Sequence, residues 1–349
     1  MRDVAVISFA QSPARHGVEE TETQMLLPVI NEALEKAGVT RADVGFTCSG
    51  SCDYLAGAPF SFVQTLEATG AWPPISESHV EMDGAWALYE AWVRLQHGDV
   101  DVALVFSSGI SSRSDRREVL SIQLDPYYLA PLWVDDVSMA ALQARALLDA
   151  GKAGEADFAA VAARSLQAAT RNPNAHVSGE VAPSDLQEEP YLVSPLRAHD
   201  CAPVSDAAAA VVLAAGDRAR ELSERPAWIA GIDHRTEPHY PGVRDLTTSA
   251  AARMAGEQAG VDKGPVDVAE LCAVFSHEEL ILREALGLDD ATTVNPSGGP
   301  LAAHPLMVTG LIRIGEAARQ IIEHGRERTV GHAAMGPCLQ QNLVCVLEG

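Results

Sequence analysis

The stretch NPSGGPLAAHPLMVTGL, residues 295–311, is the most informative part of the chain. Gly298 and Gly299 allow positive φ angles and a close approach of the backbone to another group. His304 precedes Pro305, and proline favours the first position of a helix. The stretch therefore predicts an imidazole at a helix N-terminus, where the helix dipole disfavours the charged form. The alternative is a histidine that only caps the helix or packs beneath it.

Strand and helix patterns alternate on either side of this stretch. Short apolar runs predict strands, and longer segments with helical apolar spacing predict helices between them. The predicted elements of the first part are the strand Val4–Phe9, the helix Thr23–Ala37, the strand Val44–Cys48, the helix Ala85–Gln96 and the strand Val100–Phe106. Strands that alternate with helices of this length indicate βαβ units and an α/β class.

The second part of the chain repeats this order. EALEKAGVTRADVGFTCSG (32–50) and GEQAGVDKGPVDVAELCAVFSH (256–277) both contain a helix, Ala-Gly-Val, a polar turn, Asp-Val and an apolar strand. Pro226–Ile232 matches the first strand, and Leu306–Glu323 with Thr329–His332 matches the later helix and strand. A repeat of about 220 residues predicts two similar α/β halves.

A segment of different character separates the two halves. Residues 111–199 contain LDPYYLAPLW, two helical runs at Val137–Gly151 and Asp157–Asn172, and the polar stretch RNPNAHVSGEVAPSDLQEEP. We interpret it as an inserted helical loop domain. The predicted organisation is a first half at 1–110 that is completed by about 200–220, the inserted domain at 111–199, and a second half at 221–349.

Composition excludes several classes of function. The net charge is −23 and the sequence pI is about 4.7, so nucleic acid and anionic membranes are unfavourable partners. No run of about 18 apolar residues predicts a transmembrane helix. The start MRDVAVISFAQSPARHG lacks the longer apolar region of a secretory signal, so we expect a cytoplasmic protein. The six cysteines are too sparse for a disulfide framework, and Cys48 and Cys52 alone are weak evidence for a metal, so we expect no metal site.

Several motifs resemble those of thiolases in their sterol-carrier-protein-type (lipid-transfer-protein) form. NPSGG (295–299), His304-Pro305 and TGL (309–311) resemble the family's Asn-x-x-Gly-Gly and Gly-His-Pro signature. DCAPVSDAAAA (200–210), VFSHEEL (274–280) and MGPCLQQN (335–342) resemble three further family segments in the same order. The resemblance covers the whole chain. It implies a layered αβαβα fold with duplicated halves, a coenzyme A (CoA) ester as substrate without a tightly bound cofactor, and a homodimer.

The chain departs from the family where the nucleophile belongs. Thiolases place their reactive cysteine after the third strand, and the matching stretch here is VEMDGAWA (80–87). Ungapped, Glu81 falls at the cysteine and Asp83 at the following serine, although a shift of one or two residues is allowed. No residue from 72 to 110 is cysteine. Since a carboxylate cannot form the thioester that thiolysis needs, the usual reaction is not expected.

Two further family positions also differ. Cys272 falls where the family has an asparagine or histidine of the oxyanion hole, and a thiol is a poor hydrogen-bond donor. The family's second cysteine would fall near 332–334, whereas Cys338 lies a few residues later. Among the usual site residues, His304 alone is clearly retained.

A retro-aldol cleavage needs no covalent intermediate. A base removes the β-hydroxyl proton of a β-hydroxyacyl-CoA, the bond to the α-carbon breaks, and the thioester enolate is stabilised and then protonated. His304 is expected at the enolate oxygen. Glu81, Asp83, His277 and His332 are candidates for the base or acid, each with a structural alternative such as a helix cap or a solvated turn.

The chain also resembles steroid side-chain aldolases, which look like thiolases without the cysteine. Tyrosines are thought to carry protons in that group, and this implies Tyr240 and then Tyr54 as candidates. The same group implies an OB-fold and zinc-ribbon partner that binds acyl-CoA. Such a partner would suit a strongly acidic chain, in which Arg116 and Arg117 are the first candidates for CoA phosphates or, equally, part of an exposed face.

Three functions therefore remain open. The first is an acyl-CoA-linked carbon–carbon lyase that cleaves a degraded steroid or similar lipid side chain. The second is a non-catalytic acyl-CoA-binding subunit of a hetero-oligomer. The third is a thiolase or acyltransferase with an unusual nucleophile.

Overall fold

A ten-strand path runs through the whole molecule. The computed structural model describes residues 2–349. The strands follow the order β3-β2-β4-β7-β1-β8-β13-β12-β9-β10. Their bounds in the first half are β1 Val4–Gln11, β2 Phe46–Gly50, β3 Glu77–Val80, β4 Val102–Ile110 and β7 Val204–Ala215. In the second half they are β8 Ala227–Thr236, β9 Val268–Glu270, β10 Thr293–Val294, β12 Arg328–Met335 and β13 Gln341–Glu348.

The two halves have the same topology. In the first, β2 pairs in parallel with β3 and β4, and β7 pairs antiparallel with β4 and β1. In the second, β9 pairs in parallel with β10 and β12, and β13 pairs antiparallel with β12 and β8. A short antiparallel contact between β1 and β8 joins the halves. The predicted duplication of the α/β unit is confirmed.

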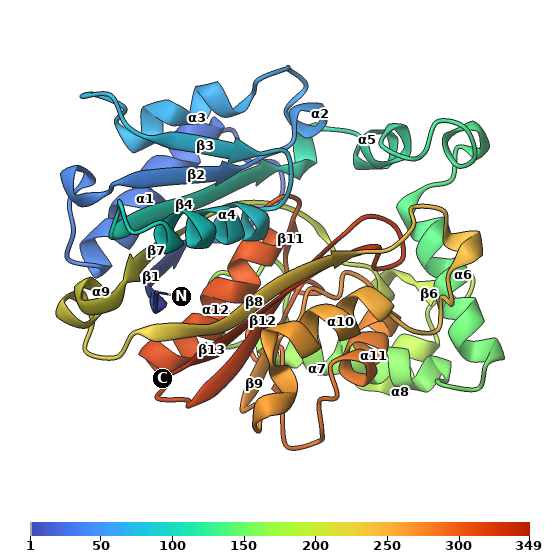
Figure 1. Cartoon of the computed structure of the whole chain (residues 1–349). Helices are drawn as coiled ribbons and strands as arrows, with labels where there is room; N and C mark the ends of the chain where they lie inside the picture. The colour runs from blue at the N-terminus through green and yellow to red at the C-terminus, as the bar shows by residue number, and fades with distance from the viewer. Residues whose placement is uncertain (1) are drawn as a thin grey trace.

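Helices form three layers around these strands (Figure 1). The helices α4 (Gly84–Gln96) and α12 (Thr309–Ile322) pack between the halves and share one apolar core with β1, β7 and β13. The helices α1 (Glu22–Lys36) and α3 (Phe62–Thr69) cover the outer face of the first half, and α10 (Ala250–Ala259) and α11 (Ser276–Ala285) cover that of the second. The predicted αβαβα arrangement is confirmed.

Burial explains which helix takes the central place. The side chains of α12 are buried almost all round, from Thr309 to Ala318 and again at Ile321. A helix with little exposed surface must lie inside a protein. In α1 the buried residues are confined to one stripe that includes Leu26, Ile30 and Ala33, so this helix covers a surface. The strand β7 is buried along nearly its whole length, which matches its continuous apolar sequence.

The inserted segment forms a helical lobe beside the second half (Figure 1). Its elements are α5 (Arg116–Ile122), α6 (Asp136–Asp149), α7 (Glu155–Ala169), α8 (Pro183–Gln187), β5 (Tyr191–Val193) and β6 (Leu196–Arg197). Ala140 and Ala144 of α6 and Phe158 of α7 join the apolar core of the second half. The division points at residues 110, 199 and 221 stay predictions. The remaining short elements are α2 (Asp53–Ala56), α9 (Gly216–Leu222) and β11 (His304–Pro305).

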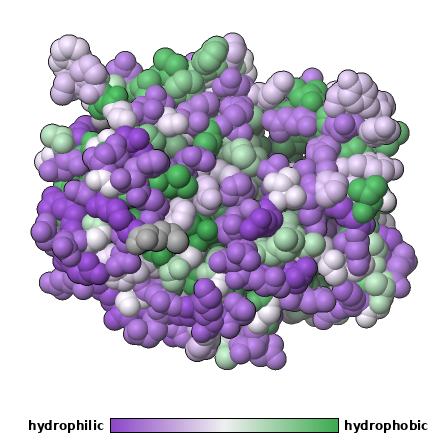
Figure 2. Space-filling view, viewed as in Figure 1, coloured by the Kyte–Doolittle hydropathy of each residue, from purple (hydrophilic) through white to green (hydrophobic). Residues whose placement is uncertain are grey.

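Within residues 2–349, no helix combines the length and the apolar character that crossing a bilayer requires. The face drawn in Figure 2 is mostly hydrophilic, with small hydrophobic groups over α2 and α3 and around α5. A mostly polar surface agrees with the high share of acidic residues in the sequence.

Candidate active site

A cavity of about 340 Å³ lies where the two halves meet the inserted lobe. Its polar lining includes Glu81 of the first half, Asp136 of α6, Glu278 of α11 and His304. Much of the remaining wall is apolar and includes Leu120, Leu124, Val134, Met139, Phe275 and Leu306. An apolar cavity of this size with a few convergent polar groups is typical of a small-molecule site.

Asp83 stands at the start of α4, two residues after Glu81, which the ungapped comparison aligns with the family's cysteine. Asp83 is the N-cap of α4, and its carboxylate accepts the N–H of Ala85 at 2.9 Å. It also accepts the N–H groups of Gly310 and Leu311 from α12, at 2.9 and 3.0 Å. Burial raises the pKa of Asp83, while these three donors and Arg313 act in the opposite direction. One carboxyl therefore ties the N-termini of both central helices together, and it does not line the cavity.

The cysteines are poorly placed for nucleophilic attack. Cys338 is the one cysteine that lines the cavity within residues 2–349, and its thiol lies 3.4 Å from the Met139 carbonyl. Burial raises the pKa of Cys338 to about 12. Cys272 is buried outside the cavity, and burial raises the pKa of its thiol to about 12 as well. Neither sulfur is a thiolate at neutral pH, and the thiolate is the reactive form.

His304 lines the cavity with one ring nitrogen already engaged. Its Nδ1 lies 2.8 Å from Oγ1 of Thr309, and that hydroxyl donates to the Pro305 carbonyl at 2.9 Å. Because the Thr309 proton is used there, Nδ1–H donates to Thr309 and Nε2 keeps its lone pair. Burial, then Arg116 and Arg313, lower the pKa of His304 to about 3. The ring is therefore neutral, and it accepts rather than donates at Nε2, whereas the sequence suggested a donor to an enolate oxygen.

Glu278 is a cavity residue that the sequence interpretation did not select. It is the third residue of α11, and its exposed fraction is 4%. An acidic residue in a first helical turn is ordinarily read as a favourable interaction with the helix dipole. Its position in the cavity depends on the packing of α11 against α7 and α10, which no local pattern reveals.

The other candidate acids and bases lie in different surroundings. Glu81 lines the cavity rim and accepts the N–H of Asp53 at 2.6 Å. His277 is buried outside the cavity, with Nε2 3.2 Å from Oε1 of Gln143. His332 is also buried: its Nδ1 accepts the N–H of Cys272, and its Nε2 lies 3.0 Å from Oδ1 of Asn342. Both ring nitrogens of His332 thus hold the core together.

The two tyrosines lie at the surface. Tyr240 is 46% exposed and Tyr54 is 58% exposed. The Tyr240 ring packs near Tyr128 of the inserted lobe, with 6.0 Å between ring centroids. Neither tyrosine lines the cavity. His239, next to Tyr240, does line it, with Nε2 accepting the N–H of Asp125 at 2.9 Å.

The residues predicted to hold CoA are engaged within the chain. Gly298 and Gly299 have φ angles of 95° and 63°, and a Cβ on either would clash with neighbouring atoms. Arg116 pairs with Asp136 at 3.3 Å, and Arg117 pairs with Asp135 at 2.5 Å. Since Asp135 and Asp136 both line the cavity, each arginine is partly neutralised before a phosphate could approach. No cluster of His, Cys, Asp and Glu is arranged for a metal ion in the part of the chain that the structure describes.

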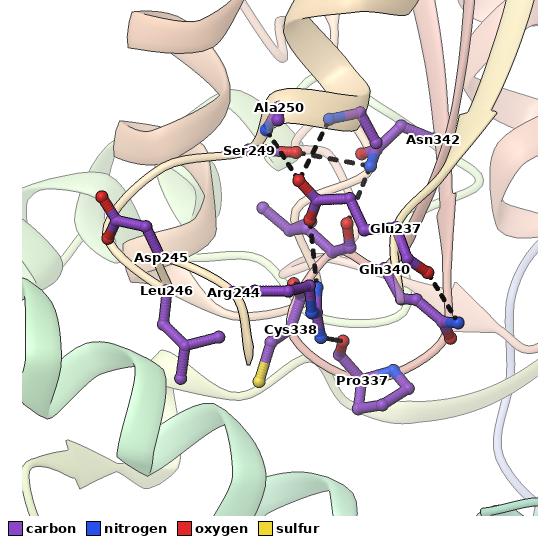
Figure 3. Close-up of polar contacts among 12 residues, drawn as sticks. Glu237, Arg244, Asp245, Leu246, Ser249, Ala250, Pro337, Cys338, Gln340 and Asn342 are labelled. Carbon is purple, nitrogen blue, oxygen red and sulfur yellow. Dashed lines mark hydrogen bonds and ion pairs between the residues drawn. The ribbon is translucent and has the colours of Figure 1, made fainter. Parts of the chain in front are cut away.

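The Gly-rich loop 335–341 forms one wall and is held from outside (Figure 3). Arg244 donates to the carbonyls of Pro337 and Cys338, at 2.8 and 3.0 Å, and pairs with Glu237 at 3.2 Å. Glu237 in turn accepts the N–H groups of Ala250 and Ala251 at the start of α10. The loop is thereby fixed to the second half, and the position of Cys338 in the wall is fixed with it.

Similar proteins were found by sequence. The chain is 28% identical to an acetyl-CoA acetyltransferase of Methanothermobacter thermautotrophicus, over 96% of this chain and 95% of that protein. It is 26% identical to sterol carrier protein 2 of Gallus gallus, over 89% of this chain and 64% of that protein. A 17-hydroxy-3-oxo-4-pregnene-20-carboxyl-CoA lyase of Mycobacterium tuberculosis is 30% identical over 42% of this chain and 41% of that lyase. No family model matches the chain.

The fold has close counterparts among solved structures. The Ltp2-ChsH2(DUF35) aldolase aligns with a TM-score of 0.82 over 99% of this chain and 98% of that chain, at 19% identity. At this identity the likeness establishes the fold, so the molecule is a thiolase-fold protein. The sequence relatives agree with this fold, and the predicted resemblance to thiolases of the sterol-carrier-protein-type group is confirmed.

Proposed function

We propose that this chain is an acyl-CoA-linked carbon–carbon lyase that cleaves a β-hydroxyacyl-CoA by a retro-aldol reaction. One observation carries the proposal. The cavity presents the open Nε2 of a neutral His304, while the stretch 80–87, where the family's cysteine is expected, contains no cysteine, and its Asp83 carboxyl is tied to backbone amides. A site with a proton acceptor and no thiolate suits a reaction without an acyl-enzyme.

The reaction divides into two proton transfers and one bond cleavage. Nε2 of His304 takes the proton of the β-hydroxyl group while the Cα–Cβ bond breaks. The β-carbon leaves as a ketone or aldehyde, and the electron pair passes to the α-carbon as a thioester enolate. A proton then reaches the α-carbon and completes the shortened CoA ester. The negative charge of the enolate favours the imidazolium, which compensates for the low pKa of the ring.

The relatives support a lyase and suggest the acyl group. One relative is a lyase for a pregnene carboxyl-CoA, and the structural counterpart is an aldolase. The cavity wall contributed by Leu120, Leu124, Val134 and Met139 would suit an apolar group. We therefore propose a steroid or similar lipid side chain as the acyl part, with CoA as part of the substrate.

The oligomeric state is part of the same proposal. The aldolase counterpart pairs Ltp2 with ChsH2(DUF35). Most arginines and lysines of this chain already take part in ion pairs, including Arg116, Arg117 and Arg164. Phosphates of CoA favour free cationic groups. We propose that the chain forms a homodimer and binds an OB-fold and zinc-ribbon subunit that supplies these contacts.

Acyl transfer is the second candidate, and Cys338 is the observation that favours it. Its thiol lines the cavity together with His304, and an acetyltransferase relative covers nearly the whole chain. The pKa of about 12 and the contact with the Met139 carbonyl argue against attack by this sulfur. A non-catalytic CoA-binding subunit is the third candidate; it predicts binding without turnover.

The test is a cleavage assay with a β-hydroxyacyl-CoA. The purified chain, alone and with the product of its neighbouring gene, should release a ketone or aldehyde and a shortened CoA ester. His304→Ala should abolish the release, whereas Cys338→Ala should retain it. Product that depends on Cys338 would establish the acyl-transfer candidate, and the absence of product with the partner present would exclude the lyase.

A further inference from the structure

Glu278 brings a carboxyl group to the cavity wall that the reaction above leaves without a role. It lies in the first turn of α11 and lines the cavity with His304 and Asp136. The residue is 4% exposed, and carboxyl groups are rarely buried to this extent unless they are paired with a cation. In the described residues, no arginine or lysine pairs with Glu278, while its neighbour Glu279 pairs with Arg164.

The hydrogen bonds of Glu278 distinguish its two oxygens. Oε2 accepts the N–H of Val274 at 2.9 Å and the N–H of Phe275 at 3.2 Å. Oε1 has no hydrogen-bond partner among residues 2–349. It is not fully buried and keeps some accessible surface. In a protonated carboxyl group the carbonyl oxygen accepts and the hydroxyl oxygen donates. Since Oε2 is occupied as an acceptor, the proton belongs on Oε1, which is the oxygen left for the cavity.

We propose that Glu278 is the general acid of this site, and that its Oε1–H delivers the proton that quenches the thioester enolate at the α-carbon. The inference rests on the proposed lyase function and deepens it. Bond making and breaking balance as follows: the O–H bond of Glu278 breaks, a C–H bond forms at the α-carbon, and Glu278 is left as a carboxylate. Water returns a proton from the imidazolium of His304 to Glu278, so the cycle consumes and produces no net proton.

The surroundings of Glu278 favour its protonated form. Burial, with a smaller contribution from Asp136, raises the pKa of Glu278 to about 8, although the two backbone donors oppose the shift. Asp136 pairs with Arg116 at 3.3 Å. Its carboxylate offsets the positive charge of Arg116, which would otherwise favour the ionised form of Glu278. The thiols of Cys201, Cys272 and Cys338 and the imidazoles of His304 and His277 are near Glu278 and are neutral at pH 7. Glu81, Asp135 and His239 also line the cavity, and Asp135 pairs with Arg117.

A helix cap is the structural alternative, and glutamine separates the two roles. In Glu278→Gln the amide oxygen still accepts from Val274 and Phe275, and the amide N–H₂ replaces the hydroxyl group toward the cavity. The fold and the binding of acyl-CoA should survive, but no proton can be delivered. Glu284→Gln is the matched control, because Glu284 lies on the same helix with an exposed side chain that pairs with Lys152.

The experiment measures enolate chemistry separately from cleavage. Acetyl-CoA is incubated with the full chain, with its partner if one is required, in D₂O, and deuterium at the α-carbon is followed by mass spectrometry. Wild type and Glu284→Gln should exchange. Glu278→Gln should be about 10²- to 10⁴-fold slower, the usual contribution of a general acid or base. Because the carboxylate form of Glu278 must first remove a proton from the α-carbon, the wild-type rate should rise with pH toward about 8, and Glu278→Gln should lose this rise.

Each outcome decides between the two claims. Equal exchange by wild type and Glu278→Gln, or no exchange by either, overturns the role of Glu278. Exchange that depends on Glu278, without cleavage of any β-hydroxyacyl-CoA, leaves Glu278 as the acid and refutes the lyase function. Cleavage that Glu278→Gln performs at the wild-type rate leaves the lyase function intact and refutes the acid.

Discussion

Thr309 sets the chemistry of His304 through one hydroxyl group. It accepts Nδ1–H and so leaves Nε2 open to the cavity. Thr309→Val keeps the shape but leaves Nδ1–H without a partner. We expect kcat to fall about fivefold, since a net hydrogen bond is worth about 1 kcal/mol, with little change in KM. Thr309→Ser restores the hydroxyl and should restore kcat; an equal loss in both variants would indicate that the methyl group matters instead.

Glu278 makes stability depend on pH in a direction that can be checked. Its pKa rises from 4.5 to about 8 in the folded chain. The folded state therefore holds this proton more tightly, so the stabilisation is complete below about pH 4.5 and is lost as pH rises to 8. Glu278→Gln cannot ionise, and its melting temperature should fall less than that of wild type between pH 5 and about 8. Parallel melting curves across this range would show that Glu278 is already ionised at pH 5.

The sequence predicted the local character of residues better than their contacts. His304 was identified because Pro305 and the following helix leave a recognisable pattern. The contacts of Asp83 with Gly310 and Leu311 join residues more than 200 positions apart, so no motif contains them. The cavity position of Glu278 has the same origin, because the surrounding residues come from six separated segments.

At the level of elements, periodicity located helices and strands to within a few residues. The helix predicted at 23–37 is α1, Glu22–Lys36, whose N-cap Thr21 bonds with Gln24. The strand predicted at 44–48 begins at Phe46, because residues 41–43 form a short 3₁₀ turn. The strand predicted at 100–106 continues to Ile110, since small residues such as Ser107 and Gly109 are buried there against the loop that follows His304. Because these residues are small and several are polar, the apolar pattern of the sequence did not show the extension.

The 335–341 loop gives a prediction about one element. Arg244 is buried, and Arg244→Ala leaves two carbonyls and the Glu237 carboxylate without their donor. The loop should loosen, and iodoacetamide should alkylate Cys338 at least about tenfold faster, as each lost buried partner costs about 1–3 kcal/mol. Peptide mapping by mass spectrometry measures the rate. Arg253→Ala, at an exposed arginine of α10 that pairs with Glu257, should leave the alkylation rate of Cys338 unchanged. An unchanged rate in Arg244→Ala would show that the loop is held by other contacts.

Across the whole molecule, three buried histidines should make the fold sensitive to acid. Burial lowers the pKa of His277 and His304 to about 3 and that of His332 to about 4, from an ordinary 6.5. The fold stabilises the neutral form of each histidine. Its contribution to the free energy of unfolding is therefore complete above pH 6.5 and is lost as pH falls toward 3 or 4. Urea midpoints should fall steeply over this range. His332→Asn should show a shallower fall, and equal slopes would mean that His332 is charged in the folded state.

The duplicated topology explains why the site lies between the two halves of the molecule. The equivalent helices α4 and α12 pack against each other, and both N-termini meet at Asp83. Each half alone has one such helix end, so the site exists only after the halves combine. At this junction Asp83 holds the two helix ends together by accepting the N–H groups of Ala85, Gly310 and Leu311.

The most direct measurement is the intact mass of the chain during turnover of a β-hydroxyacyl-CoA. A ketone or aldehyde and a shortened CoA ester should form in equal amounts, with the protein mass unchanged at every time point because no thioester to the chain is formed. An acyl adduct that appears at the rate of turnover and maps to Cys338, or to any other cysteine, would contradict the retro-aldol mechanism and make acyl transfer the function of this site.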